Sequence, residues 1–442
     1  MLKVKTVLLS ALVAAPLAAC GQAPSTPTEP ALSTAALPPG SEDPNFKKSL
    51  NGFGTPGGFA THMVTLPNNK ALVVFQMGSV TPGQEMFIKV RRYNEDGELD
   101  RTFGGSGNID ANLRDIDGAS RKVTPQDIVV TPEGRIFIAA TGTDPTFTTQ
   151  KIVRPIIFGL TPAGVLDTNF DGNGRLYPFS NTHSLDNNDI RPADLAYDPA
   201  TKKLTMGATI DPKSGNSFLW TYTVGVNQTG SFKENFVKEA GANLTFEKFG
   251  RSSGGELVIA AGITPPSGGL PRAYLAKQLD NGLVTGKAIN VVNFEAFVRG
   301  LQVDGNKIFL AGTGFTGSGF STQGFVARFN LETLTKDTSF GSGGVRLVSK
   351  EVRDVAFSKD SGTAKKVLVA GTDGTDYLVA RMSYGGQMDT AFGKDGIALV
   401  NFSNFFGEFA NALSVDSKNR IWVAGVVKAD GRNRAGIARL LP

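Results

Sequence analysis

Cysteine and histidine are scarce in this chain of 442 residues, which contains one cysteine, Cys20, and two histidines, His62 and His183. A single cysteine excludes an intramolecular disulfide. There is no Cys/His cluster of the kind that binds zinc, and no HExxH, GxSxG or Walker A motif is present. The sequence therefore identifies no reaction, and we predict neither a metal nor a cofactor.

A strong excess of one charge is also missing. The formal net charge is +5 at pH 7, and removing Lys3 and Lys5 with the N-terminal leader leaves +3. The remaining basic residues are interleaved with acidic ones and form no stripe along which a nucleic acid would lie. We therefore expect no nucleic-acid partner.

Apolar runs of about 20 residues, the length that spans a bilayer, are absent. The N-terminal sequence MLKVKTVLLSALVAAPLAAC has two lysines, a short apolar run from Val7 to Ala15, and small residues that end at Cys20. This order is typical of a secretory signal peptide, which we assign to residues 1–19.

The stretch from Leu17 to Cys20 resembles the lipobox of bacterial lipoproteins. The resemblance implies cleavage before Cys20, acylation of that residue, and a membrane partner held through the lipid. The alternative is an ordinary secretory signal in which the cysteine is incidental. Gly21 is not a signal for retention at the inner membrane, so the resemblance favours an extracytoplasmic, lipid-anchored protein of the outer membrane or cell surface.

Pro, Ser, Thr and Ala dominate the sequence from Gly21 to about Asn45. A segment of this composition buries too little apolar surface to fold by itself. We expect residues 20–45 to form a disordered tether and residues 46–442 to form the folded domain.

A helical spacing of apolar residues is missing from residues 46–442, where short apolar runs bounded by Gly, Asp and Asn predict antiparallel β-strands. One type of strand, such as KVLVAGT, recurs seven times, beginning at Lys70, Arg135, Lys203, Glu256, Lys307, Lys366 and Arg420. Units of about 50 to 70 residues with four short strands are typical of propeller blades. The sequence therefore predicts an all-β fold, a seven-bladed β-propeller.

A turn motif, LDxxFGxxG, occurs clearly in four units, as in MDTAFGKDG from Met388. Its characteristic residues are Asp100, Phe103, Gly104, Asp167, Phe170, Asp337, Phe340, Gly341, Asp389, Phe392 and Gly393. The last unit stops at AGIARLLP, before its turn. We interpret SLNGFGTPGGF, residues 49–59, as the missing copy, so that the N- and C-terminal segments pair and close the ring.

This motif resembles the delta-60 repeat, a bacterial repeat family whose members look like β-propellers and for which no common activity is assigned. The resemblance covers the whole folded domain and implies the fold only. Within the motif, Asp389 can accept backbone N–H groups, Phe392 can fill the gap between blades, and Gly393 can adopt a positive φ. We interpret the motif as scaffold. The alternative, a set of calcium sites, lacks the dense Asp/Asn spacing of oxygen cages.

One column of polar residues is a candidate functional ring. Aligning the first strand of each unit brings together His62, Asp127, Asp194, Lys248, Arg299 and Asp354, with Ala412 in the seventh unit. The inner strands line a propeller's channel, so these side chains could bind a metal through His62, Asp127 and Asp194 or form a hydrolytic or lactonase-like site. The alternative, which we favour, is that they pair with one another and with backbone amides of neighbouring blades.

Long loops follow the second and fourth strands of the units, which places them on the same face of an antiparallel propeller. Loops presented by a rigid scaffold are common binding surfaces. The aromatic residues concentrated there are Phe147, Tyr177, Phe179, Phe315, Phe320, Phe405, Phe406 and Phe409. They either form a binding face or fold over the channel mouth and pack together. We expect a binding or scaffold role at the cell envelope, with a protein, polysaccharide or wall partner, and an extracytoplasmic propeller enzyme as the alternative.

Overall fold

The computed structural model describes residues 37–51, 57–78, 85–105, 110–114, 122–144, 152–178, 188–212, 215–227, 232–264, 272–278, 284–289, 291, 295–316, 321–348, 350–403, 407–429 and 431–442. Cys20 and the expected signal peptide lie outside these residues. The chain divides into residues 1–37 and a compact unit, Pro38–Pro442. Over the ranges given, no helix has the length and apolar character needed to cross a membrane.

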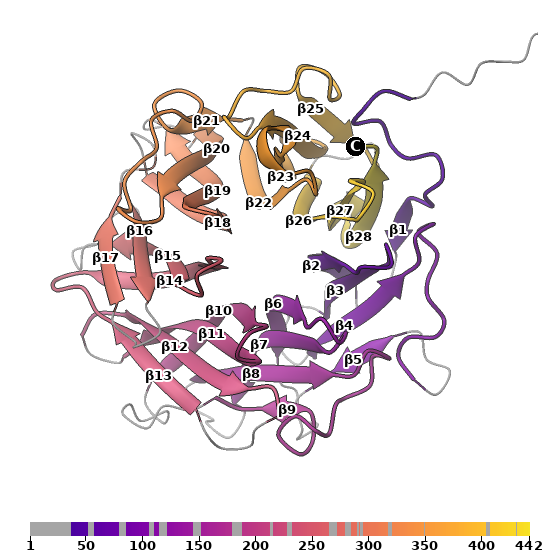
Figure 1. Ribbon diagram of the computed structural model, residues 1–442. Coiled ribbons are helices and arrows are strands. Elements are labelled where there is room, and N and C mark those ends of the chain that lie inside the picture. Colours follow the sequence, from indigo (N-terminus) through magenta and orange to yellow (C-terminus); the bar gives the residue numbers. More distant parts are fainter. Residues whose placement is uncertain are drawn as a thin grey trace, which may run out of the picture. The chain divides into compact units, whose positions relative to one another are not determined.

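Residues 38–442 form seven four-stranded antiparallel sheets arranged as a ring, which confirms the predicted seven-bladed β-propeller (Figure 1). Blade 1 consists of β2 (Gly58–Thr65), β3 (Ala71–Gly78), β4 (Met86–Tyr93) and β5 (Ala111–Leu113). Blade 2 consists of β6 (Val123–Val130), β7 (Ile136–Asp144), β8 (Ile152–Leu160) and β9 (Arg175–Leu176). Blade 3 consists of β10 (Asp189–Asp198), β11 (Lys203–Asp211), β12 (Phe218–Gly225) and β13 (Phe232–Val237). Blade 4 consists of β14 (Asn243–Arg251), β15 (Leu257–Thr264), β16 (Arg272–Gln278) and β17 (Val284–Ala288).

The remaining three blades follow the same order, with the first strand innermost. Blade 5 consists of β18 (Glu295–Asp304), β19 (Lys307–Thr316), β20 (Ser321–Asn330) and β21 (Val345–Leu347). Blade 6 consists of β22 (Glu351–Phe357), β23 (Lys366–Thr372), β24 (Tyr377–Ser383) and β25 (Ile397–Val400), with a 3₁₀ turn, η3 (Gly362–Ala364), before β23. Blade 7 consists of β26 (Phe409–Val415), β27 (Ile421–Ala429), β28 (Arg432–Leu440) and β1 (Ser49–Asn51).

The apolar core lies between the blades. Seven clusters of buried side chains each join two neighbouring blades, and together they follow the whole ring. The second strands are buried along nearly their entire length, as in β23, where every residue from Val367 to Thr372 is buried. A strand of this kind carries apolar side chains on both faces of its sheet, and each face is covered by one neighbouring blade.

The outer strand of blade 7 comes from the N-terminal segment. β1 pairs antiparallel with β28, so that Ser49 lies opposite Ile437 and Asn51 opposite Ala435. Residues 49–59 are therefore not the missing turn, and that interpretation was wrong. The turn precedes β1: the backbone N–H of Phe46 donates to the Asp43 carbonyl over 3.1 Å, as that of Phe392 does to the Asp389 carbonyl over 2.9 Å. EDPNFKK was missed because it has Lys47 where the motif has glycine.

The packed chain also begins earlier than residue 46. The N–H of Gly40 donates to the Leu441 carbonyl over 3.0 Å, and that of Gly393 donates to the Pro39 carbonyl over 2.9 Å. Asp43, which follows Gly40 in the chain, is buried and accepts a hydrogen bond from Arg439 of β28. The expected boundary is corrected accordingly, since residues 38–45 belong to blade 7 rather than to a tether.

In the turn motif, basic side chains from two strands contact the carboxylate of the motif's aspartate. The Asp389 carboxylate accepts from Lys366 Nζ over 3.0 Å, at the start of β23, and from Arg381 Nε over 3.1 Å, near the end of β24. Asp100 has an equivalent pair of partners in Lys70 and Arg92, and Asp337 has one in Lys307 and Arg328. Asp167 forms an ion pair with Arg135. Burial opposes ionisation of Asp100, but hydrogen bonds from Lys70, Thr102 and Arg92 hold its pKa well below the ordinary range. The motif thus ties three strands of one blade together.

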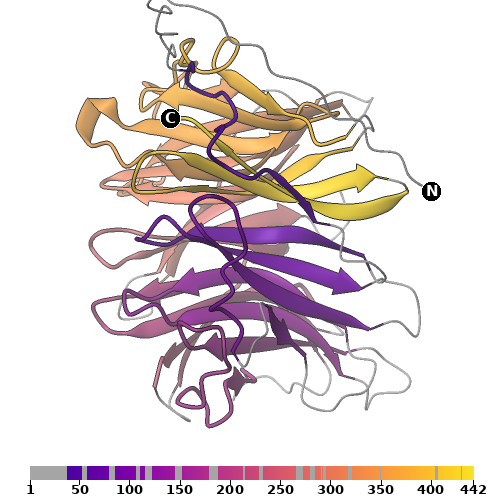
Figure 2. The ribbon, with the colours of Figure 1, turned by 90° about the vertical axis from the view of Figure 1, so that its right-hand side faces the viewer.

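The motif also connects each blade to the next. The Phe103 ring is fully buried below Gly164 in the turn of blade 2, where an added Cβ would lie 2.6 Å from the ring. The guanidinium of Arg92 lies 5.0 Å from the same ring and donates to the Pro162 carbonyl of blade 2. These turns project together from one face of the ring, on the left in Figure 2. The motif is therefore part of the scaffold between blades, and the described residues contain no cluster of carboxylates that would hold calcium there.

We predict that Asp43→Ala destabilises the propeller by about 3 to 5 kcal/mol, because it leaves the guanidinium of Arg439 buried without its carboxylate partner. Arg439 is 2% exposed, and its Nε and Nη2 atoms donate to Asp43 over 2.9 and 2.7 Å. Equilibrium unfolding in urea measures the change. Glu98→Ala is the control, since its ion pair with Lys47 is exposed and we expect a change of at most about 1 kcal/mol. Equal effects of the two substitutions would show that the N-terminal turn does not hold blade 7 together.

Candidate functional site

Every inner strand contains a β-bulge at the same place. The register with the second strand skips one residue in each blade, and the skipped residues are Thr61, Gln126, Ala193, Glu247, Arg299, Arg353 and Asn411. A bulge inserts one extra residue and redirects the side chains on either side of it. We call these seven residues the bulge ring, and the residues that directly follow them the inner ring.

The inner ring consists of His62, Asp127, Asp194, Lys248, Gly300, Asp354 and Ala412. Five of the six polar residues predicted to share a column therefore do so. Arg299 does not: Gly300 pairs with Ala311 at the inner-ring position, and Arg299 belongs to the bulge ring. The prediction was wrong there because the turn between β18 and β19 is one residue shorter than the turn in blade 1: two residues separate Asp304 from its partner Lys307, whereas three separate Leu66 from Lys70.

The inner-ring carboxyls bind the backbone of the next blade. Asp127 accepts the N–H of Leu195 over 3.0 Å, and Asp194 accepts that of Phe249 over 2.5 Å. In blade 6, Asp354 accepts the N–H of Leu413 over 2.8 Å. These contacts give the N–H groups of the inner strands the hydrogen-bond acceptors that buried donors need. They agree with the interpretation of the polar ring as a set of contacts between inner strands.

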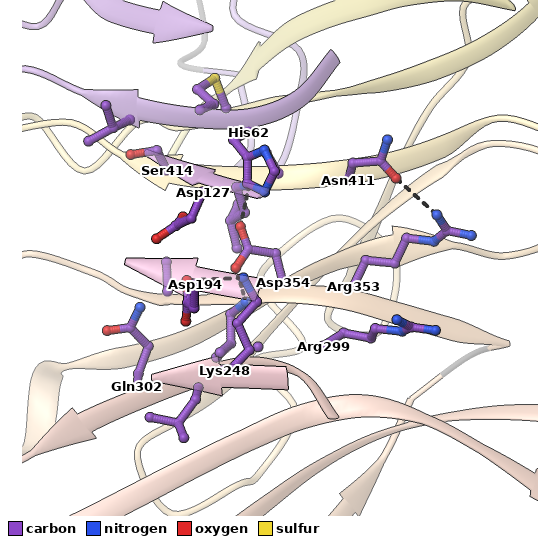
Figure 3. Close-up of a pocket in the computed structure, with 18 of the residues that line it drawn as sticks. His62, Asp127, Asp194, Lys248, Arg299, Gln302, Arg353, Asp354, Asn411 and Ser414 are labelled. Atoms are coloured by element: carbon purple, nitrogen blue, oxygen red, sulfur yellow. Dashed lines mark hydrogen bonds and ion pairs between the residues drawn. The ribbon is translucent and has the colours of Figure 1, made fainter. Parts of the chain in front are cut away.

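Lys248 supplies the positive charge among these carboxyls (Figure 3). Its Nζ lies 3.5 Å from Asp194, and its side chain is 25% exposed to the channel. Burial alone lowers the pKa of Lys248, but the fields of Asp194, Asp127 and Asp354 outweigh burial and raise it. Burial and the adjacent Asp194 raise the pKa of Asp127 well above its ordinary value. Burial raises the pKa of Asp354 to about 6.

His62 does not join the carboxyls as a ligand set. Among the described residues, no group of three or more His, Cys, Asp or Glu side chains is arranged to hold a metal ion. The buried Nδ1 atom of His62 has no hydrogen-bond partner in the described part of the chain. Burial, followed by the charge of Lys248, lowers the pKa of His62 to about 3, so the imidazole is neutral. The hypothesis of a metal bound by His62, Asp127 and Asp194 is therefore not supported.

The channel contains a cavity of about 1110 Å³ whose two ends differ. The inner strands begin at one end, which we call the loop end because the long loops connect there, and they finish at the tight turns. At the loop end, the cavity is lined only from blades 1, 5, 6 and 7 among the described residues, by Phe59, Thr61, Phe297, Arg299, Thr313, Phe315, Thr322, Glu351, Arg353 and Asn411. Blades 2, 3 and 4 line it only from the inner ring towards the tight turns.

Two bulge-ring arginines extend towards the loop end side by side in Figure 3. Arg353 donates to Asn411 Oδ1 over 3.0 Å and to Glu351 Oε2 over 3.1 Å, and its guanidinium lies 4.5 Å from the ring of Phe409. Arg299 has no ion pair with any described carboxylate, and its guanidinium lies 5.3 Å from the ring of Phe297. This end of the channel therefore presents positive charge beside aromatic rings.

The predicted aromatic face is described at three of its eight positions. Phe315 lines the loop end of the cavity, where it meets Phe297 edge to face at 5.7 Å. Phe409 lies under Arg353, and Tyr177 packs against the apolar cluster between blades 1 and 2. The other five positions, Phe147, Phe179, Phe320, Phe405 and Phe406, lie outside the described residues.

Sequence reasoning missed Phe297, Arg353 and Asn411 at this site. Arg353 and Asn411 each lie one residue before the inner-ring position of their blade, and Phe297 lies three residues before Gly300, so the column drawn from the sequence passed beside them.

Comparisons with known proteins support the fold and do not extend to function. No protein-family model and no curated protein matches the chain. Among solved structures, a protein of unknown function from Dyadobacter fermentans is similar, with a TM-score of 0.51 and 11% identity over 90% of this chain and 100% of that one. An α-L-arabinanase from Penicillium chrysogenum has a TM-score of 0.47 and 12% identity over 89% and 98% of the two chains. The β-propeller domain of the Trilobed protease from Pyrococcus furiosus has a TM-score of 0.45 and 10% identity over 86% and 93%.

We predict that His62 remains neutral down to a pH of about 4, whereas an ordinary histidine titrates near pH 6.5. Its lowered pKa means that only the unfolded state binds this proton between about pH 3 and 6.5, so this residue makes the free energy of unfolding rise with pH in that window. Asp354 opposes it, because its raised pKa makes the native state hold a proton more tightly up to about pH 6. Imidazole chemical shifts therefore give the sharper measurement.

The signal of His62 is identified in the His183→Gln variant, which has one histidine. Shifts that stay constant from pH 8 to pH 4.5 would agree with a neutral imidazole beside Lys248. A midpoint near 6.5 would mean that water reaches the ring freely and that His62 does not lie in the environment described.

Proposed function

We propose that this protein is a binding propeller of the bacterial cell envelope, anchored by a lipid on Cys20, and that its ligand binds at the loop end of the central channel. The observation that supports this proposal is the asymmetry of the cavity. Arg299, Arg353, Phe297 and Phe315 line its loop end, and they come from neighbouring positions in blades 5 and 6. Pockets that combine apolar rings with a few convergent polar groups are the usual form of ligand sites.

The inner ring favours a binding role over catalysis. Asp127, Asp194 and Asp354 each accept an N–H group from the next blade. A general base or nucleophile needs a carboxylate oxygen within hydrogen-bond reach of a substrate, and these contacts occupy part of that capacity. The alternative is an extracytoplasmic propeller hydrolase, for which the favouring observation is that Asp127, Asp194 and Asp354 line the cavity together with Lys248.

The envelope location rests on the N-terminal sequence. The signal peptide of residues 1–19, the lipobox-like stretch ending at Cys20 and the resemblance to delta-60 repeats all suit a bacterial lipoprotein. A polysaccharide, wall material or an envelope protein would then lie within reach of the channel mouth.

Retention on isolated envelopes of the producing bacterium tests the binding role. We predict that Phe315→Ser in the chain from Gly21 onwards, which keeps every described residue, weakens retention about tenfold or more, the usual effect of losing an aromatic contact at the centre of an interface. The matched control is Tyr197→Ser, which removes an aromatic side chain from the opposite end of the same cavity. Unchanged melting temperatures establish that both variants are folded.

Equal retention by the two variants would rule out the loop end as the binding surface. Breakdown of the envelope material that stops in Asp127→Asn, while retention persists, would favour the enzymatic alternative over the binding role.

The anchor has its own test. We predict that Cys20→Ala moves the protein from the detergent phase to the aqueous phase in a detergent partition experiment, because no other segment of the sequence is apolar enough to hold a bilayer. Continued partitioning of Cys20→Ala into detergent would contradict the lipoprotein assignment.

A further inference from the structure

We propose that Arg299 and Arg353 bind the carboxylate of an acidic sugar whose ring lies against Phe297 and Phe315. The inference rests on the proposed function, because it names the ligand class for the same end of the channel. It is carried by the placement of two arginines at the same position of adjacent blades, in the wall of a cavity that is also lined by the half-buried side chains of Phe297 and Phe315.

Arg299 is the side chain with most capacity to bind a ligand. It is exposed to the cavity and makes no ion pair within the described part of the chain. Its contact with the Phe297 ring orients the guanidinium without using its N–H groups. A guanidinium has five N–H donors in a planar fork that fits two oxygens of a carboxylate.

Arg353 is held beside it by other residues. Asn411 and Glu351 each accept one hydrogen bond from this guanidinium, which leaves further N–H donors for a ligand. The Phe409 ring supports the guanidinium at 4.5 Å. Arg353 is therefore oriented in advance, and binding a ligand would cost little side-chain entropy.

The charges at this end of the channel are not balanced. Two arginines face one carboxylate, Glu351, among the described side chains that line the loop end. Glu247, the bulge-ring neighbour of Arg299, does not complete the balance at neutral pH, since burial raises its pKa to about 8. An anion bound between the arginines would relieve their repulsion and gain charge-assisted hydrogen bonds.

The aromatic rings favour a sugar over a bare anion. Phe297 and Phe315 line the same wall as the arginines and stand edge to face. Aromatic faces gain most from an apolar surface, which the C–H face of a pyranose provides and inorganic phosphate or sulfate does not. A uronic acid carries such a face and a carboxylate on one ring. The cavity of about 1110 Å³ exceeds the volume of ordinary small-molecule pockets and has room for several sugar residues.

Calorimetric titration of the chain from Gly21 onwards tests the inference with an oligogalacturonate and its methyl ester, which keeps the sugar rings and removes the charge. We expect the acid to bind at least tenfold more tightly than the ester at low ionic strength, with the difference falling as salt is added. Arg299→Gln and Arg353→Gln should each weaken binding of the acid about tenfold, the usual loss for a hydrogen bond to a charged group. Arg101→Gln, an exposed arginine in a motif turn, is the charge-matched control and should leave binding unchanged.

Other outcomes overturn the inference and leave the proposed function to its own test. Equal binding of acid and ester, or full binding by Arg299→Gln, would mean that the loop end takes a neutral ligand. Displacement by inorganic phosphate with no effect of Phe315→Ser would assign a simple anion site. Preference for an acidic peptide, or no binding of any of these probes, would reject the sugar. Envelope retention that still depends on Phe315 would keep the binding role in each case.

Discussion

The structure depends on one constraint: each four-stranded sheet is apolar on both of its faces. In β23, buried side chains follow one another without a polar alternation from Val367 onwards. Such a sheet cannot leave one face in water, and a two-layer sandwich would cover only one side of it. A ring gives every sheet two neighbours, which is why the core is divided into clusters between blades and has no common centre.

The same constraint shapes the wall of the channel. Opposite the inner ring, the second strands carry mostly alanine or glycine, as at Ala139, Gly207 and Ala370. Small side chains suit the narrow space where the blades converge, and larger ones such as Trp220 fill the core elsewhere in the blade. There is little room for apolar side chains near the axis. N–H groups of the inner strands therefore donate hydrogen bonds to carboxyls of the preceding blade. Under the proposed binding role, contacts with a ligand then fall to residues just outside this ring.

The fold could be predicted from the sequence because its signals are local and repeated. Runs such as KVLVAGT report a buried strand each time they occur, and turns such as MDTAFGKDG report the connection that follows. The ion pairs of Asp389 with Lys366 and Arg381 were not predicted, because the sequence analysis considered only backbone N–H groups as partners of the aspartate. What could not be predicted depends on register. A turn that is one residue shorter between β18 and β19 moved Arg299 out of the predicted column, and Lys47 in the place of a glycine hid the turn at Asp43.

At the candidate site, the sequence predicted the residues that repeat from blade to blade better than those that do not. His62, Asp127, Asp194, Lys248 and Asp354 were found because they occupy equivalent positions in the repeat, and a repeat is easy to align. Arg353 and Phe297 distinguish the candidate site because most other blades have different residues at those positions. An alignment that searches for similar residues passes over such differences. Phe315 was found through the length of its loop rather than through the repeat.

The position of the N-terminal turn has a consequence for biosynthesis. Asp43 and Arg439, whose ion pair lies inside blade 7, are 396 residues apart in the chain. The first residues of the domain to leave the ribosome thus remain without their partners until the last ones are made. Closing so long a loop is slow and costly in entropy. Until then one face of blade 1 and one face of the last completed blade stay uncovered, so these two faces are the last apolar surfaces of the domain to be buried.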